Sequence, residues 1–208
     1  YLTGDDEDKY RLDLSGFTGT IEPKELTDSM LTVEGGPFTY TGKAHKPNVT
    51  VKDGNVMLTA GTDYDVVNYS DNIKAGTARV EVRGKGNYTG TVSKTFTIEK
   101  AKLEINGGTV AAKTYDGSVN ANVTGVNFGG LQNGETLIFG EDYTVSGATF
   151  DSADAGGNKT VTGTVALLDT DKTRNYILSD GSLTIPDQTI TKADAPDNIN
   201  WIIEVFEN

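Results

Sequence analysis

Residues 61–69 read GTDYDVVNY, and the first part of this stretch recurs at residues 140–143 as GEDY. Glycine reaches the positive φ angles of tight turns, and an aspartate side chain can accept a hydrogen bond from nearby backbone. Three of the five residues that follow Tyr64 in this stretch, Val66, Val67 and Tyr69, are β-branched or aromatic, as is typical of strands. The stretch therefore predicts a turn that leads into a strand, and the chain contains it twice.

Three more short sequences recur in the same order around these turns. Tyr-x-Gly stands at residues 40–42 and 115–117, Asn-Tyr at 87–88 and 175–176, and Thr-Ile with a lysine shortly after it at 97–100 and 184–192. Because the order is kept, the pattern indicates a duplicated unit and not shared composition. Tandem units of one size are typical of structural arrays. The pattern predicts a first domain at 25–100 and a second at 101–192.

The composition predicts an all-β fold. The chain is rich in threonine and contains 25 glycines but only 5 prolines among 208 residues. Many short strands joined by glycine-rich turns are typical of β-sandwiches, which need about 100 residues each. No window has the apolar spacing of an amphipathic helix. We therefore expect two tandem immunoglobulin-like sandwiches.

Alternating side chains locate the clearest strands. In residues 77–82, Ala78, Val80 and Val82 are expected to face inward. In residues 91–98, Val92, Phe96 and Ile98 share a face, which Lys94 interrupts without an evident reason.

The second domain is expected to follow the same plan with longer loops. Residues Val119, Ala121 and Val123 share one face, as do Val161, Val165 and Leu167. The extra length is expected as loops at 127–133 and 169–174, and the glycine pairs at 107–108 and 129–130 are expected as turns.

The two ends of the chain read as parts of neighbouring units. Residues 1–24, with alternating Tyr10, Leu12 and Leu14, are expected to be the end of a preceding repeat. Residues 193–208 are expected to be a linker followed by an apolar segment around Trp201, which starts a further unit or forms a capping strand.

Charge and residue usage exclude several functions. The net charge of −12 opposes binding to nucleic acid or to anionic lipid. The chain has no cysteine and one histidine, which removes thiol chemistry and cysteine metal sites. No apolar run reaches the ~20 residues that cross a bilayer as a helix. We expect no nucleic-acid partner and no membrane insertion in this segment.

The ordered motifs resemble those of a known family. KTYDG at 113–117, GEDY at 140–143, NY at 175–176 and ITKA at 190–193 are similar to the YDG-type repeats of bacterial surface adhesins. The first unit, with its YTGK at 40–43 and GKGNY at 84–88, resembles related bacterial Ig-like modules. The resemblance covers residues 1–193 and implies an Ig-like fold, export, surface display and no defined catalytic residues.

The recurring tyrosines are expected to be structural. A buried tyrosine packs its ring and needs a partner for its hydroxyl, as in the tyrosine corner of Ig-like sandwiches. The six tyrosines of the motifs are Tyr40, Tyr64, Tyr88, Tyr115, Tyr143 and Tyr176.

Candidate chemistry is sparse. His45 is expected in a solvated loop, and the carboxylates, Asp65 and Glu81 among them, form no recognisable catalytic motif. Calcium could be bound by the acidic stretches at 5–8, 151–154 or 169–171, although none has EF-hand spacing. An isopeptide bond would need a buried lysine, for which Lys94 is the one hint. We predict no catalytic, cofactor-binding or metal residues and leave any ligand-binding residues unknown.

The leading functional hypothesis is a non-catalytic spacer or stalk in a bacterial cell-surface or secreted protein, an adhesin by resemblance, with neighbouring repeats as partners. The alternative is an adhesive module for carbohydrate or a host protein, and the aromatic candidates for it are Tyr69, Phe128 and Phe139. A hydrolase is a third hypothesis and would need a cleft with converging carboxylates.

Overall fold

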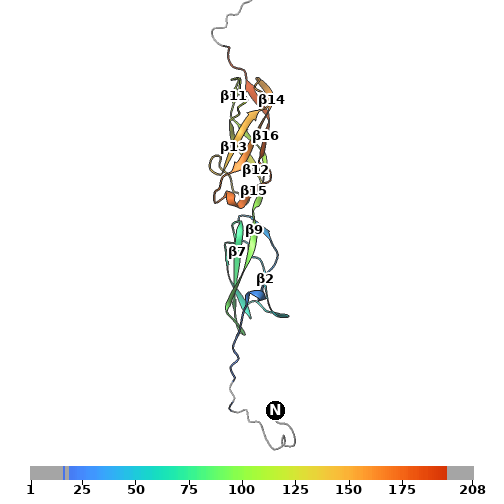
Figure 1. Cartoon of the computed structure of the whole chain (residues 1–208), viewed down its shortest axis with the longest axis vertical. Coiled ribbons are helices and arrows are strands. Elements are labelled where there is room, and N and C mark those ends of the chain that lie inside the picture. The colour runs from blue at the N-terminus through green and yellow to red at the C-terminus, as the bar shows by residue number, and fades with distance from the viewer. Residues whose placement is uncertain (1–15, 17–18, 196–208) are drawn as a thin grey trace, which may run out of the picture. The chain divides into compact units, whose positions relative to one another are not determined.

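The computed structural model describes residue 16 and residues 19–195. The predicted strand at Tyr10 to Leu14, the acidic stretch at 5–8 and the Trp201 segment lie outside these residues. Within them the fold is all-β, as predicted (Figure 1). The helical segments of the described part are short 3-10 turns, η2 (Asp28–Met30) and η3 (Thr173–Asn175).

The first half of the described chain contributes nine strands to three sheets, whose orders are β1-β8, β2-β4-β5 and β3-β9-β7-β6. Their bounds are β1 (Lys24–Glu25), β2 (Leu31–Val33), β3 (Phe38–Thr39), β4 (Val49–Asp53), β5 (Val56–Met57), β6 (Tyr64–Ser70), β7 (Gly76–Gly84), β8 (Tyr88–Thr89) and β9 (Thr91–Glu99).

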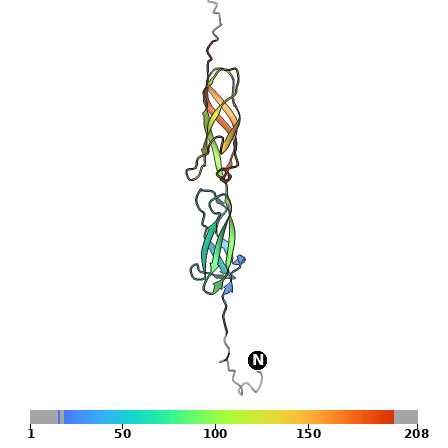
Figure 2. The ribbon, with the colours of Figure 1, turned by 90° about the vertical axis from the view of Figure 1, so that its left-hand side faces the viewer.

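The second half contributes a three-stranded sheet, β12-β10-β15, and a four-stranded sheet, β11-β16-β14-β13. The bounds are β10 (Ala101–Val110), β11 (Lys113–Thr114), β12 (Val123–Gly129), β13 (Tyr143–Phe150), β14 (Gly156–Leu167), β15 (Tyr176–Leu178) and β16 (Ser182–Thr191). Figure 2 shows these strands, coloured yellow-green to orange-red, twisting about one another.

The two four-stranded sheets share a strand plan. In each, a two-residue strand pairs in parallel with the closing strand: β3 with β9 and β11 with β16. The closing strand lies next to β7 in one sheet and β14 in the other, and the other neighbour of each begins at the tyrosine of the Gly-x-Asp-Tyr turn. The recurring sequences therefore occupy corresponding places in the two sheets.

Contacts divide the chain into two compact units. One consists of residues 1–32, 49–68 and 80–94, and the other of residues 33–48, 69–79 and 95–208. Strands β2, β6, β7 and β9 pass from one unit into the other. The predicted domain limits at residues 24, 100 and 192 stay a prediction.

Each unit has a hydrophobic cluster of its own. The cluster of the first unit includes Leu31, Val51, Tyr64, Val82 and Val92. Along β7, Ala78, Val80 and Val82 are fully buried while Arg79 is exposed, which confirms the predicted alternation. Burying such aliphatic side chains stabilises a fold by about 1.5–3 kcal/mol each.

The buried residues of the cluster in the second unit lie within residues 123–190 and include Val123, Phe150, Val161, Leu183 and Ile190. Val161 and Val165 of β14 are buried and Leu167 is partly buried, so the predicted face is confirmed.

Lys94, which interrupts the apolar face of residues 91–98, is exposed although Val92 and Phe96 on that face are buried. Some local predictions for the second domain were wrong. Val119 is exposed and precedes β12, which begins at Val123. The predicted loop at 127–133 is in part strand, because β12 continues to Gly129.

The glycine pair at 107–108 forms a β-bulge within β10 and not the predicted turn. The register with β12 shifts between Ile105 and Gly108, and Gly107 has a φ of 91°. A Cβ on Gly108 would stand 2.4 Å from the carbonyl oxygen of Gly125. The neighbouring strand approaches so closely that a side chain cannot be accommodated there.

Candidate functional site

The two Gly-x-Asp-Tyr sequences form the same turn. Gly61 and Gly140 have φ angles of 84° and 82°, and each donates its N–H to the carbonyl of the tyrosine three residues later, at 2.7 and 2.9 Å. The aspartate carboxylate accepts from the backbone N–H four residues before it: Asp63 from Thr59 at 2.8 Å and Asp142 from Ile138 at 2.9 Å. The repeated residues are thus turn formers, as expected from their chemistry.

The aspartate of the second turn has further partners. Asp142 is 5% exposed, accepts a hydrogen bond from the Thr170 hydroxyl at 3.0 Å, and pairs with the Lys172 ammonium at 2.8 Å. The same ammonium donates to the carbonyl of Thr136 at 2.8 Å. Burial favours a higher pKa for Asp142, but the hydrogen bonds from Lys172, Ile138 and Thr170 outweigh it and hold the pKa below its usual value.

The Tyr-x-Gly sequences also correspond. Tyr40 follows β3 and donates its N–H to Glu99 at the end of β9, while Tyr115 follows β11 and donates to Thr191 at the end of β16, both at 2.8 Å. The glycines two residues later, Gly42 and Gly117, have φ angles of 70° and 74°. The side chains differ: Tyr40 is 4% exposed and Tyr115 is 46% exposed. The expectation of a buried ring was therefore wrong for Tyr115.

Four of the six motif tyrosines are buried: Tyr40, Tyr64, Tyr143 and Tyr176. Tyr88 is half-buried, and its hydroxyl lies 3.3 Å from a carboxylate oxygen of Asp53. The hydroxyl of Tyr143 accepts the N–H of Val126 at 3.0 Å. These partners are backbone or neighbouring side chains, as a structural role requires.

Tyr40, Glu135 and Tyr176 form a compact polar group, which we call the tyrosine–glutamate cluster. All three residues belong to the second unit. Tyr40 donates its hydroxyl to one oxygen of Glu135 at 2.5 Å, and Tyr176 donates to the other at 2.6 Å. The two rings meet edge to face with centroids 5.4 Å apart. Hydrogen bonds to a carboxylate are about twice as strong as neutral ones, so this cluster firmly joins three distant segments of sequence.

Further contacts surround the tyrosine–glutamate cluster. The buried amide oxygen of Asn175 in η3 accepts the N–H of Ala75 at 2.9 Å. A Cβ on Gly42 would come within 2.5 Å of the Cβ of Asn133, so glycine is required for that approach. Between β9 and β10 stands Lys100 alone, and Ala101 is already 2% exposed. The chain therefore passes from β9 into β10 through a single residue.

Both phenols of the cluster resist ionisation. Burial, together with the hydrogen bond and charge of Glu135, raises the pKa of Tyr40 to about 12. The pKa of Tyr176 is raised further, again chiefly by burial and then by Glu135. Neutral hydroxyls are what the carboxylate needs as donors.

Alkaline titration should detect this arrangement. An unfolded tyrosine ionises near pH 10, so the folded protein holds the Tyr40 proton more tightly than the unfolded chain does. The contribution to stability is therefore complete below pH 10 and is lost as pH rises from 10 to about 12. We expect Tyr40→Phe to reduce the slope of stability against pH in this window, measured by denaturant unfolding. An unchanged slope would contradict the cluster.

The predicted candidate residues lie in three segments: His45 in the loop after β3, Asp65 on β6 and Glu81 on β7. His45 is half-buried, with its ring 5.5 Å from that of Phe38 and 3.3 Å from the Thr41 hydroxyl, and so is less solvated than expected. Asp65 pairs with Lys85 at 3.4 Å, and Glu81 is half-buried on β7.

Within residues 19–195 no group of three histidine or acidic side chains could hold a metal ion. In the acidic stretch at 169–171, Arg174 pairs with Asp169 at 2.7 Å and Asp171 at 3.5 Å. Asp151 accepts the N–H of Thr160 at 3.1 Å. Two of the proposed calcium stretches thus make internal turn contacts.

Two of the three aromatic candidates for a ligand, Phe128 and Phe139, lie against the same tyrosine, Tyr143. Phe128 packs edge to face on Tyr143 at 4.9 Å and borders the second core. Tyr69 is half-buried and donates to the carbonyl of Pro47 at 2.7 Å. Phe139 is 42% exposed and lies against Tyr143. The exposed Lys94 removes the observation that suggested an isopeptide bond.

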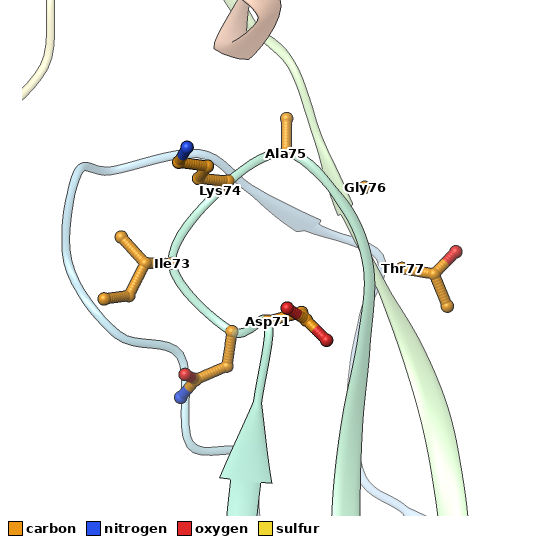
Figure 3. A pocket seen from close by; sticks show the side chains of 7 residues that line it. Asp71, Ile73, Lys74, Ala75, Gly76 and Thr77 are labelled. Atoms are coloured by element: carbon orange, nitrogen blue, oxygen red, sulfur yellow. The ribbon is translucent and has the colours of Figure 1, made fainter. Parts of the chain in front are cut away.

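A shallow hollow of about 410 Å³ lies in the loop between β6 and β7 (Figure 3). Asp71, Ile73 and Lys74 line it, and Ala75 stands on the side of the loop nearest η3. Lys74 is exposed and lies 3.5 Å from Asp171. The lining residues are consecutive, from Asp71 in the loop to Thr77 in β7, and Asp71 is the carboxylate among them.

Comparison with known protein families supports a YDG-type domain in the second half of the chain. Residues 99–184 match the YDG domain family. The match begins at the last residue of β9, contains the YDG sequence at 115–117 and covers less than half of the 208 residues. Comparison with curated proteins and with solved structures found no match. Among the described residues, no helix is long and apolar enough to cross a membrane.

Sequence reasoning missed the partners of the cluster. Glu135 lies in a loop after Asn133-Gly134, and nothing in its surroundings marks it as a tyrosine partner. Asn175 belongs to the recurring Asn-Tyr pair, so the recurrence signalled the position but not its contact with Ala75.

Proposed function

We propose that this chain is a non-catalytic spacer segment of a bacterial cell-surface or secreted protein. In this proposal residues 25–100 and 101–192 are two tandem immunoglobulin-like sandwiches, and neighbouring repeats are their partners. The YDG match at 99–184 supports the second of these domains. The shared strand plan and the two equivalent Gly-x-Asp-Tyr turns support a duplicated unit.

The tyrosine–glutamate cluster carries the proposal. A spacer must transmit position along the chain, and independent domains on a flexible linker do so poorly. Here Lys100 is the whole connection between β9 and β10, and Glu135 accepts hydrogen bonds from tyrosines on both sides of it in sequence. In this proposal the hydrogen bonds of Tyr40 and Tyr176 to Glu135 restrict bending next to Lys100. Such stiffness is the property that a spacer needs.

Nuclear magnetic relaxation of backbone amides tests this stiffness. We expect the amides of residues 25–100 and 101–192 to report one common rotational diffusion tensor. Glu135→Ala removes the acceptor of both tyrosines, and the two segments should then tumble with shorter, separate correlation times. Glu141→Ala, which removes an exposed carboxylate in the turn at 140–143, is the matched control and should leave the common tensor unchanged.

Two results would oppose the proposal. The first is independent tumbling of the two segments in the unaltered chain. The second is a Glu135→Ala variant that tumbles as the unaltered chain does, because the cluster would then hold nothing together.

A further inference from the structure

Residues around the loop at 151–156 and Tyr115 repeat the residues around the loop at 71–76 and Tyr40, where the tyrosine–glutamate cluster lies. The loop at 71–76, DNIKAG, corresponds to DSADAG at 151–156, and both show the same succession of bends before a long strand. Gly76 and Gly156 start β7 and β14 with φ angles of 142° and 154°. Tyr115 corresponds to Tyr40 through its backbone bond to the closing strand.

The two corresponding ends differ in what covers them. At the first end, Tyr40 and Ala101 are 4% and 2% exposed, because Glu135, Asn175 and Tyr176 lie against that end. At the second end, Tyr115 is 46% exposed and Ala193, which follows the closing strand as Ala101 does, is exposed as well. A hollow of about 490 Å³ lies there, lined by Tyr115, Ala155 and residues 192–195.

We propose that Tyr115, Ala155 and Ala193 form a docking surface for a further YDG-type domain. Its occupant presents a carboxylate to the Tyr115 hydroxyl, an amide oxygen to the Ala155 N–H and an aromatic ring to the Tyr115 ring. Glu135, Asn175 and Tyr176 supply these groups at the first end. The occupant is therefore a domain whose end resembles that of residues 101–192.

The surface suits this occupant better than a polar small molecule. An exposed tyrosine ring beside two alanines offers apolar area, and its hydroxyl gains most from a charged acceptor in a partly buried setting. The covered copy of the same surface in this chain shows that such a domain end fits the backbone geometry. The inference rests on the proposed spacer function, because it adds one more domain through contacts of the same kind as those of Glu135, Asn175 and Tyr176.

A fusion protein tests the docking surface. A second copy of residues 101–195 is attached after Lys192 of the full chain, in place of residues 193–208, so that the copy's first alanine replaces Ala193. We expect Tyr115 to become protected from nitration by at least about tenfold, and the Ala155 amide to exchange with solvent as slowly as the Ala75 amide does. The same fusion with Glu135→Ala and Asn175→Ala in the second copy should lose both protections.

Each other outcome counts against the inference. Tyr115 that reacts equally in the fusion and in the original chain would overturn it, as would a second copy that does not fold there. Tyr115 that is already protected in the original chain and becomes reactive when residues 196–208 are deleted would assign the surface to this chain's own end. The relaxation experiment can show that Glu135 couples the tumbling of residues 25–100 and 101–192 while the fusion still leaves Tyr115 reactive. In that case the docking proposal alone fails and the spacer function stands.

Discussion

Replacing Asp142 by alanine is expected to lower the free energy of unfolding by about 2–4 kcal/mol. The substitution leaves the Ile138 N–H, the Thr170 hydroxyl and the Lys172 ammonium without their shared acceptor. Removing one partner of a buried pair costs about 3–5 kcal/mol, and the value is reduced here because the Lys172 side chain remains one-third exposed. Chemical denaturation followed by circular dichroism measures the loss.

Asp63→Ala is the matched control for this variant. Asp63 makes the equivalent bond to the Thr59 N–H but is only half-buried, so about 1 kcal/mol is expected. Equal losses for the two variants would show that the Lys172 pair contributes nothing. A double variant, Asp142→Ala with Lys172→Met, should recover part of the loss, because no charge is then left partly buried.

The Asp142 contribution also depends on pH in a defined direction. Because the pKa of Asp142 in the folded protein lies below its usual value, the stabilisation is complete above about pH 4 and is lost as pH falls through the folded pKa. The difference in stability between the unaltered protein and Asp142→Ala should therefore shrink as the pH falls below about 4. A difference that stays constant as acid is added until the protein unfolds would contradict the ionised carboxylate.

Leu183→Ala is expected to destabilise the second core by about 2–5 kcal/mol, and Leu31→Ala the first core by a similar amount. Both side chains are 1% exposed and each lies in a cluster confined to one compact unit. Truncating a buried leucine loses transfer free energy and leaves a cavity. Hydrogen exchange of amides in each unit, measured with increasing denaturant, should report the loss only where the cavity was made.

An exposed aliphatic residue provides the control for both leucines. Ile177 is 52% exposed on β15, so Ile177→Ala should change stability by less than about 0.5 kcal/mol. If Leu31→Ala lowered the protection of amides in both units equally, the two clusters would behave as one core.

Much of the fold followed from local chemistry. The alternation of apolar and polar residues predicted β7 and β14, because each of these strands buries one face. The glycine and aspartate pattern predicted both turns, because those residues form the turn by their own hydrogen bonds. The bulge at Gly107 was not predictable, because a bulge and a turn use the same glycine conformation and only the partner strand distinguishes them.

Much less of the candidate site could be predicted from the sequence. The recurrence singled out Tyr40 and Tyr176, but the carboxylate between them comes from a loop 95 residues away from Tyr40. Tyr115 has the same local sequence as Tyr40 yet is exposed, because burial there is decided by what packs on the end and not by the motif. Motifs of this kind predict a backbone position, whereas contacts between distant segments depend on the whole fold.

Single-molecule extension tests the central proposal, that residues 25–100 and residues 101–192 fold as two separate β domains. Residues 24–99 and 101–191 have extended lengths of about 270 and 330 Å. Pulling the chain from its two ends should give two separate unfolding events, with gains in length close to these values once the folded length of each proposed domain is subtracted. A single event that releases both lengths together would contradict the account.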